Sequence, residues 1–345
     1  MLPPQGTATV SVHAINVAAD SSRSLARLFL EPVTPGRETM ANPHYAFLIE
    51  HAGTGRRIMF DLGARKDMEN FAPAVKERFL SLPGFNIKVE KDVVEQLQEG
   101  NVYLDTIDTV IWSHTHLDHT GDMSKFPPST KLVLGPGSDK RTYPTVNDAM
   151  LLDSDFFGRD VQEISFEDSS LNIAGRPTLD FFGDGSLYLF DMPGHCPGHI
   201  SALARVKPDS FVLLGGDSCH HPAQIRPNAH IHVTFPCPGH ILDSARQTFN
   251  KEHFSPEVND STTPLLGVPP PPSAYADREK SLESQRVLGE LDAHPDVFVV
   301  CAHDASLVGV LDLFPECLDD WKEKGWKEKA VWAFMDEKNR AFRFN

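Results

Sequence analysis

The sequence predicts an α/β protein of layered strands and helices, and three observations support this prediction. Short apolar runs rich in β-branched and aromatic residues recur along the chain, as buried strands require. Longer stretches between them carry apolar residues at helical spacing. Several apolar runs end abruptly in an aspartate or a histidine. Because α/β folds place reactive groups at strand ends, the same pattern indicates where a site would lie.

The expected elements follow one another in a strand-and-helix alternation. Two strands joined by a tight turn open the pattern, and four more follow: residues 45–50, 57–61, 106–112, 187–191, 211–214 and 297–301. Helices are expected where apolar residues form one stripe: residues 66–82, 90–99 and 277–294.

Two segments do not fit the alternation. Residues 139–184 are mixed in pattern, and residues 222–276 are rich in proline, histidine and phenylalanine, with four prolines at 269–272. A long irregular segment in a compact domain is usually a lid, a binding loop or disordered. We expect the later segment to be either a lid or pocket wall, or a packing insert.

Composition limits the class of protein. The chain has 345 residues, with 32 basic and 48 acidic side chains and a net charge of −16. This balance argues against a nucleic-acid partner and against an anionic membrane surface. The five cysteines form no CxxC pair, and we find no secretory signal and no apolar run of about 18 residues. A cytoplasmic protein is therefore expected.

The sixteen histidines include one dense group. The run 114–119 reads His-Thr-His-Leu-Asp-His. In an extended chain His114 and His116 share one face, so both imidazoles can reach one ion. Asp118 and His119 follow in the turn, where a second ion can lie beside the first. Zinc accepts both imidazole nitrogen and carboxylate oxygen.

This run resembles the HxHxDH signature of the metallo-β-lactamase superfamily. Four other motifs of that family occur in the family's order, around Asp61, the two PGH tripeptides of residues 193–199, Asp217 and His303. The resemblance spans residues 60–304 and implies an αββα sandwich, two mixed sheets face to face with helices outside. We expect one such domain over residues 1–345, with an insert at about 222–276.

The resemblance also implies the metal ligands. One divalent ion would be held by His114, His116 and His195, and the other by Asp118, His119 and His303. Asp217 and a hydroxide would bridge the two ions. Zinc is the expected metal, and Mn²⁺ or Fe²⁺ remain alternatives because the bridge is a carboxylate rather than a thiolate.

Several nearby residues are expected to have other roles. In the family pattern the first PGH histidine is the ligand, so His199 is expected behind the ligands or in the core. Asp61 is expected to support the ligand turn. We interpret Cys196, Cys219 and Cys301 as small buried residues rather than ligands.

The implied chemistry is hydrolysis of a carbonyl compound by the bridging hydroxide. Asp118 would carry the proton to the leaving group. The pattern resembles the lactone-opening branch, which often has a tyrosine three residues after the bridging aspartate. Here that position is His220, which, like His221, could donate a hydrogen bond to the substrate instead.

The chain also resembles fungal family members that open benzoxazolinone-type carbamates and act as γ-lactamases. We therefore expect a small cyclic amide or carbamate as substrate, ahead of an acyl homoserine lactone or another lactone. Three aromatic residues of the insert would either line a pocket for a flat apolar ring or pack in the protein interior: Phe235, Phe249 and Phe254.

Other classes are expected less. A glyoxalase II-like thioesterase would need a basic cluster, a nuclease a basic patch, and a flavodiiron enzyme a further domain. A binding module without catalysis would not need all seven ligand positions. The partner is expected to be a small molecule, and a monomer and a homodimer remain open.

Overall fold

The computed structural model describes residues 2–19, 22–33, 35–237, 239 and 262–344. Over these residues most strands belong to two six-stranded sheets. The first sheet has the order β1 (Val10–Asn16), β4 (Tyr45–His51), β5 (Arg57–Phe60), β6 (Ile107–Ile111), β7 (Lys131–Leu134), β10 (Val161–Glu163). The second has the order β11 (Leu171–Ile173), β12 (Arg176–Asp180), β13 (Leu187–Asp191), β14 (Ile200–Lys207), β15 (Ser210–Leu214), β16 (Val297–Val300).

Both sheets are mixed. In the first, β1, β4 and β5 are antiparallel neighbours, whereas β5, β6, β7 and β10 run parallel. In the second, β11 to β15 form an antiparallel meander, and β16 joins β15 in parallel. Two short ribbons lie outside the sheets: β2 (Ser24–Leu25) with β3 (Thr39–Met40), and β8 (Thr142–Tyr143) with β9 (Leu151–Leu152).

Among the described residues, the helices are short except for α6. Asp92 caps α2 in a capping box with Glu95, and Asp277 caps α6 through its side chain. The α-helices are α1 (Pro73–Val75), α2 (Val93–Glu99), α3 (Asp153–Phe156), α4 (Ile231–Thr234), α6 (Arg278–Asp292), α7 (Trp326–Ala330) and α8 (Arg340–Arg343). None of the helices in the described part of the chain has both the length and the apolar character needed to cross a bilayer.

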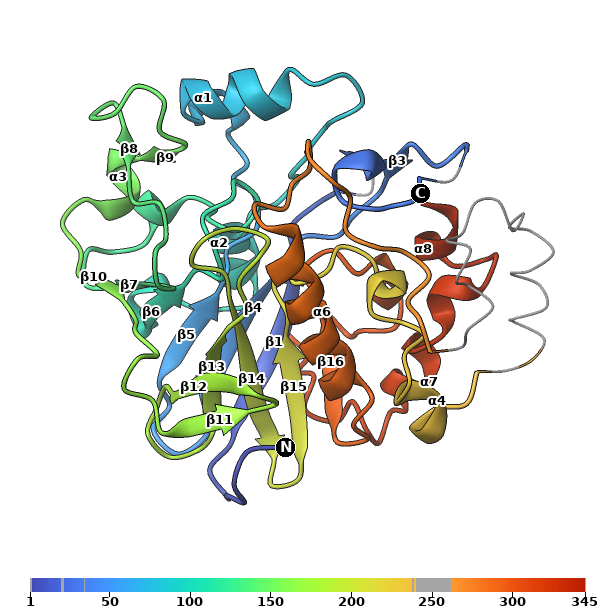
Figure 1. Cartoon of the computed structure of the whole chain (residues 1–345). Coiled ribbons are helices and arrows are strands. Elements are labelled where there is room, and N and C mark those ends of the chain that lie inside the picture. Colours follow the sequence, from blue (N-terminus) through green and yellow to red (C-terminus); the bar gives the residue numbers. More distant parts are fainter. Residues whose placement is uncertain (1, 20–21, 34, 238, 240–261, 345) are drawn as a thin grey trace.

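The two sheets pack face to face. Phe47 and Ile49 of the first sheet share one buried core with Leu189 and Ala202 of the second, because alternate residues of a strand point to the same side. The opposite faces pack against helices, α2 on the first sheet and α6 on the second (Figure 1). The predicted αββα fold is therefore confirmed.

The largest departure among the expected helices is residues 66–82. In that region the structure has a 3₁₀ helix, η2 (Met68–Asn70), the short α1 and a π-helical stretch, η3 (Lys76–Leu80). Pro73 occupies the first turn of α1, where its missing N–H costs nothing, so the helix begins there. Phe79 and Leu80 only partly join the core, which leaves little packing to extend the helix.

The mixed segment 139–184 contains strands. It supplies β10, β11 and β12, of which β10 and β11 lie at the edges of the two sheets. Edge strands are short and carry polar residues, which hides the alternation in the sequence. The strands β1, β7 and β14 were also absent from the expected set. Buried Ser201 and Arg205 interrupt the apolar run of β14.

The insert expected at 222–276 is described in part. Ala223, Ile231 and Leu266 pack with the C-terminal segment, and the Trp332 indole donates to the carbonyl of Phe235. Phe235 therefore packs against the C-terminal segment. Phe249 and Phe254 lie outside the described residues.

Candidate metal centre

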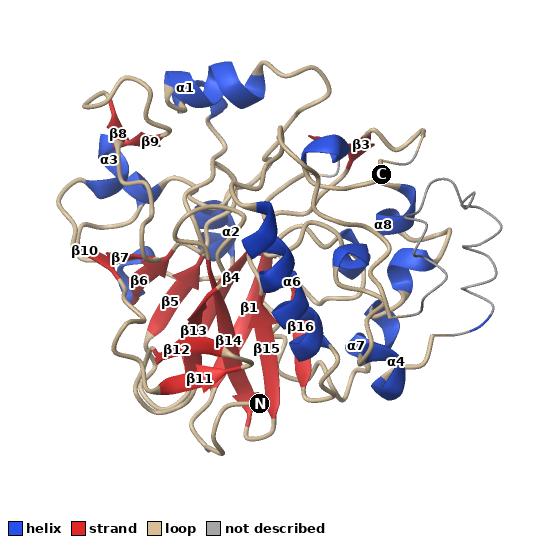
Figure 2. Cartoon of the chain, in the orientation of Figure 1, coloured by secondary structure: helices blue, strands red, loops and turns tan. Residues whose placement is uncertain are grey.

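The candidate site lies where strand ends meet. Loops and short helices gather beyond one end of the strands in Figure 2, and the predicted ligands follow β6, β13, β15 and β16 at that end. These strands belong to both sheets, so each sheet supplies part of the site. The hydrogen bonds of the strands fix the backbone next to these residues, so their polar side chains can converge beyond the strand ends.

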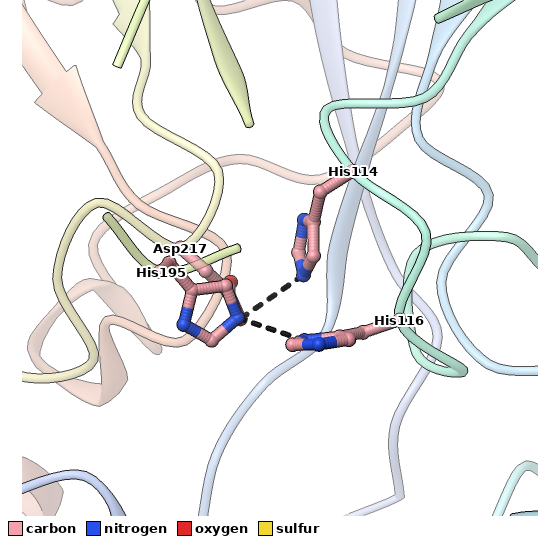
Figure 3. Close-up of side chains that lie close together, drawn as sticks. All are labelled: His114, His116, His195 and Asp217. Carbon is pink, nitrogen blue, oxygen red and sulfur yellow. Dashed lines mark hydrogen bonds and ion pairs between the residues drawn. The ribbon is translucent and has the colours of Figure 1, made fainter. Parts of the chain in front are cut away.

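One group of potential ligands joins the turn after β6 to the second sheet. His114 and His116 face His195 and Asp217 (Figure 3). The Nε2 atom of His195 lies 2.8 Å from His116 Nδ1 and 3.3 Å from Asp217 Oδ2. His114 Nε2 is 3.7 Å from the same Oδ2. These four side chains offer ligand atoms within 4.8 Å of one another.

A second group lies on the other side of Asp217. The Oδ1 atom of Asp217 is 3.0 Å from His119 Nε2 and 3.2 Å from His303 Nε2. His303 Nε2 is also 3.4 Å from Asp118 Oδ2. Burial raises the pKa of Asp217, but the charges of His119 and His303 outweigh it and hold that pKa well below its usual range. Asp217 is therefore ionised and presents one oxygen to each group.

The chemistry of these donors fits divalent cations. His114 Nε2 is buried with no hydrogen-bond partner among the described residues, and His119 Nε2 and Asp217 Oδ1 have none apart from their own contact at 3.0 Å. Burial lowers the pKa of the imidazoles of His114, His116 and His195, so these rings are neutral. Neutral imidazole is the form that binds a metal. Unpaired buried lone pairs are costly, and a bound cation would satisfy them.

Asp61 holds the ligand turn. Its carboxylate accepts hydrogen bonds from the backbone N–H of Ser113 (2.6 Å), the Ser113 hydroxyl (2.7 Å) and His119 Nδ1 (2.8 Å). Asp61 itself has φ of +60°, an unusual conformation for a residue with a side chain. Because Nδ1 is held by Asp61, the ring of His119 is oriented with Nε2 toward Asp217.

His199 contacts the backbone N–H of Asp217. Its Nδ1 donates to the carbonyl of Met192 (2.9 Å), and its Nε2 accepts from the backbone N–H of Asp217 (2.9 Å). Gly216, with φ of +51°, allows this approach, because a Cβ there would lie 2.8 Å from His199 Nε2. The second PGH histidine therefore contacts Asp217 through the backbone, whereas His195 contacts the carboxylate.

His220 lies beside Asp217 and contacts Tyr275, a residue that the sequence analysis did not single out. His220 Nε2 is 3.0 Å from Asp217 Oδ2, and its Nδ1 is 2.7 Å from the Tyr275 hydroxyl. Gln224 lies 3.0 Å from the same hydroxyl. A consistent set of donors runs from the Gln224 amide to Tyr275, from Tyr275 to His220, and from His220 to Asp217. Tyr275 falls in the segment interpreted as an insert, where no motif marks it.

His44 is the other residue that sequence reasoning missed. It is buried, and its Nε2 lies 3.8 Å from Asp118 Oδ2. Burial lowers the pKa of His44 to about 3, although Asp118 opposes this shift. Its only sequence signal is a histidine placed directly before a strand.

The cysteines near the site face one another rather than the ligands. Cys219 Sγ lies 3.3 Å from Cys301 Sγ, and both side chains belong to the core under α6. The hydrogen bond from Cys219 and burial both raise the pKa of the Cys301 thiol. Burial also raises the pKa of Cys196. Protonated thiols are poor ligands, and the ligand groups found among the described residues contain no cysteine.

The fold and the converging histidines define a metal-dependent hydrolase. Residues 40–251 match the family model for the metallo-beta-lactamase superfamily, and the chain belongs to this family. The predictions of the family and of a hydrolase are thereby confirmed.

Several curated relatives match nearly the whole chain. Gamma-lactamase FDB1 from Fusarium pseudograminearum is 36% identical over 97% of this chain and 84% of its own length. Metallo-hydrolase mfmC from Annulohypoxylon moriforme is 35% identical over 90% and 82% of the two chains. Cytochrome P450 monooxygenase mpaDE' from Penicillium brevicompactum is 40% identical over 97% of this chain, which spans only 38% of that longer protein.

Solved structures show the same fold. A Bacillus thuringiensis AiiA mutant with N-decanoyl-L-homoserine bound at its active site superposes with a TM-score of 0.58 and 17% identity. The superposition covers 90% of this chain and 99% of AiiA.

Proposed function

We propose that the protein binds two divalent ions, zinc in the first instance, and opens a small cyclic amide or carbamate such as a γ-lactam or a benzoxazolinone. The observation that carries the proposal is the position of Asp217. One of its oxygens faces His195, and the other faces His119 and His303. A shared carboxylate with separate donors on each side is the arrangement that a dinuclear centre requires. Mn²⁺ and Fe²⁺ remain possible because the donors are nitrogen and oxygen.

Two such ions, when bound, lower the pKa of water toward neutrality and polarise a carbonyl. The chain supplies the remaining requirements. Asp118 is only partly buried, with 20% of its side chain accessible, whereas Asp217 has 4%. Asp118 can therefore exchange protons with the substrate side of the cluster and deliver one to the leaving nitrogen. A general acid of this kind contributes about 10²- to 10⁴-fold.

His220 is proposed to orient the substrate. Tyr275 fixes its ring from behind, so Nε2–H points toward the cluster. When an ion engages Asp217 Oδ2, this N–H is left as a donor for a substrate oxygen or nitrogen. Lactone-opening relatives often have a phenol at this sequence position. The imidazole at this position is therefore a departure from the lactone-opening pattern.

The choice of substrate class rests on two supports. Gamma-lactamase FDB1 aligns over nearly the whole chain, whereas the lactonase AttM of Agrobacterium fabrum aligns over only 32% of it, at 32% identity. The net charge of −16 also disfavours polyanionic substrates. Both supports favour a small, uncharged heterocycle.

A substrate panel tests the proposal. The protein, stripped of metal and reloaded with Zn²⁺, is offered benzoxazolinone, simple γ-lactams, acyl homoserine lactones and a glutathione thioester. Cyclic amides or carbamates should turn over fastest, and chelation should abolish their turnover. His116→Ala should also abolish it, while His51→Ala, a buried histidine that pairs with Asp184 instead, should retain it. Turnover of only the thioester, or fewer than two metal equivalents, would overturn the proposal.

A further inference from the structure

We infer that His44 is a further ligand of the second metal ion, on the side of that ion where Asp118 and His303 lie. The inference rests on the proposed dinuclear centre and adds a residue that the sequence motifs of the site do not include. His44 lies 70 residues before His114 in the chain, directly ahead of β4.

The backbone on both sides of His44 is tied to the site. The carbonyl of Pro43 accepts from His303 Nδ1 (2.9 Å), and the N–H of Tyr45 donates to the carbonyl of Ala302 (3.1 Å). The N–H of His44 donates to Asn16 Oδ1 (3.0 Å). One short segment therefore orients His303 and positions the His44 ring beside it.

The ring faces the second group. His44 and His303 are in edge contact with centroids 5.0 Å apart, and their ligand atoms lie with that of Asp118 within 4.8 Å of one another. His44 Nε2 is 3.8 Å from Asp118 Oδ2. This distance is too long for a hydrogen bond. It does suit two ligands of one ion, which lie about 3–4 Å apart when each bond is about 2.0–2.2 Å.

The absence of hydrogen bonds to the His44 ring among the described residues gives an independent reason for metal coordination. His44 Nδ1 is buried and has no hydrogen-bond partner among the described residues. With Nε2 beyond bonding distance of Asp118 as well, the described structure leaves this buried imidazole without a hydrogen bond through either nitrogen. Coordination through Nε2 would satisfy the nitrogen that faces the cluster.

The consequence is an asymmetric centre. The first group has three imidazoles and one oxygen of Asp217. On the second side, His303 belongs to two sets of neighbouring ligand atoms, one with His44 and Asp118 and the other with His119 and Asp217. An additional imidazole donor would hold the second ion more firmly and leave less room for solvent. We therefore expect the second ion to be the one more sensitive to changes at His44.

Cobalt binding tests this assignment without relying on activity. The full-length protein and its His44→Ala and His44→Phe variants are stripped and titrated with Co²⁺, and the ligand-field absorption and competition with a chelator are recorded. Phenylalanine keeps the ring volume, so it reports on the ligand even if alanine impairs folding. His51→Ala is the matched control for loss of a buried histidine.

Both His44 variants should bind the first equivalent normally and the second about 10- to 100-fold more weakly, with a changed ligand-field spectrum. The control should behave like the parent protein. An unchanged spectrum and affinity in both variants would overturn the assignment. So would a changed pH profile of hydrolysis with unchanged Co²⁺ binding, because His44 would then only orient Asp118. If the parent protein itself binds fewer than two equivalents, the dinuclear proposal fails instead.

Discussion

Two buried clusters of polar side chains in this protein are built in opposite ways. Beside α6, Arg226 and Asp292 form a two-pronged ion pair with distances of 2.7 and 2.9 Å. Lys327 donates to the carbonyls of Asp292, His294 and Val297. The charged atoms of these three side chains therefore have partners within the protein.

The metal centre leaves several buried atoms unpaired. His114 Nε2 has no hydrogen-bond partner among the described residues, and His119 Nε2 and Asp217 Oδ1 have only each other. A chain that can satisfy Arg226 and Asp292 so fully could satisfy these atoms too. This difference indicates that the first cluster stabilises the fold, whereas the donors of the second cluster are arranged to hold an ion.

Removing the shared carboxylate should give the largest effect. Asp217→Ala takes one oxygen from each ligand group, so we expect hydrolysis to fall by more than about 10³-fold. Metal analysis should show loss of both equivalents, while the metal-free protein remains folded by circular dichroism. Substantial activity in this variant would mean that Asp217 is not shared by two ions.

A substitution in the cluster of Arg226, Asp292 and Lys327 should lower stability without affecting metal binding. Asp292→Ala leaves the guanidinium of Arg226 buried and unpaired, which should lower the free energy of unfolding by about 3–5 kcal/mol. Denaturant titration measures this loss. The protein that remains folded should still bind its metals and retain its turnover per folded molecule. Loss of metal binding in folded Asp292→Ala would remove the contrast between the two clusters.

Asp155 provides an intermediate case. Its Oδ2 accepts from the N–H of Leu152, but its Oδ1 is buried without a partner among the described residues. Burial raises the pKa of Asp155 from 3.8 to about 6. Between these pH values the folded carboxyl keeps a proton that the unfolded chain releases. The contribution of Asp155 to the free energy of unfolding is therefore full below about pH 4 and is lost as the pH rises through 6.

The variant Asp155→Asn lacks this titration. Its stability relative to the parent protein should therefore increase by about 2–3 kcal/mol between pH 4 and pH 7, as measured by denaturant titration at each pH. Hydrolysis should be unaffected when both proteins are folded. A pH-independent difference would show that Asp155 is ionised in the folded protein.

The smallest effect is expected behind His220. Tyr275→Phe removes one hydroxyl that fixes the His220 ring. We expect kcat to fall by about tenfold, equivalent to about 1.4 kcal/mol, with two metal equivalents retained. A change confined to KM, or loss of a metal, would place Tyr275 in a different role.

The site was more accessible to sequence reasoning than the fold around it. The run from His114 to His119 is local, so spacing alone predicts convergence of its side chains. His44 and Tyr275 reach the site only because distant backbone pairing brings them there, and no local pattern records that pairing. The strand β14 was missed for a related reason. Its buried Arg205 is satisfied by the carbonyls of Gly185, Pro208 and Pro4, which the sequence does not reveal.

The origin of the ligands in both sheets has a consequence for chain topology. His114 follows β6 of the first sheet, and His303 follows β16 of the second, 189 residues later. Ions bridged by Asp217 would act as a cross-link that closes this long loop and joins the two halves of the sandwich. Cross-links across long loops restrict the unfolded chain most. Bound metal would then resist mechanical separation of the sheets, in addition to supporting chemistry at their edge.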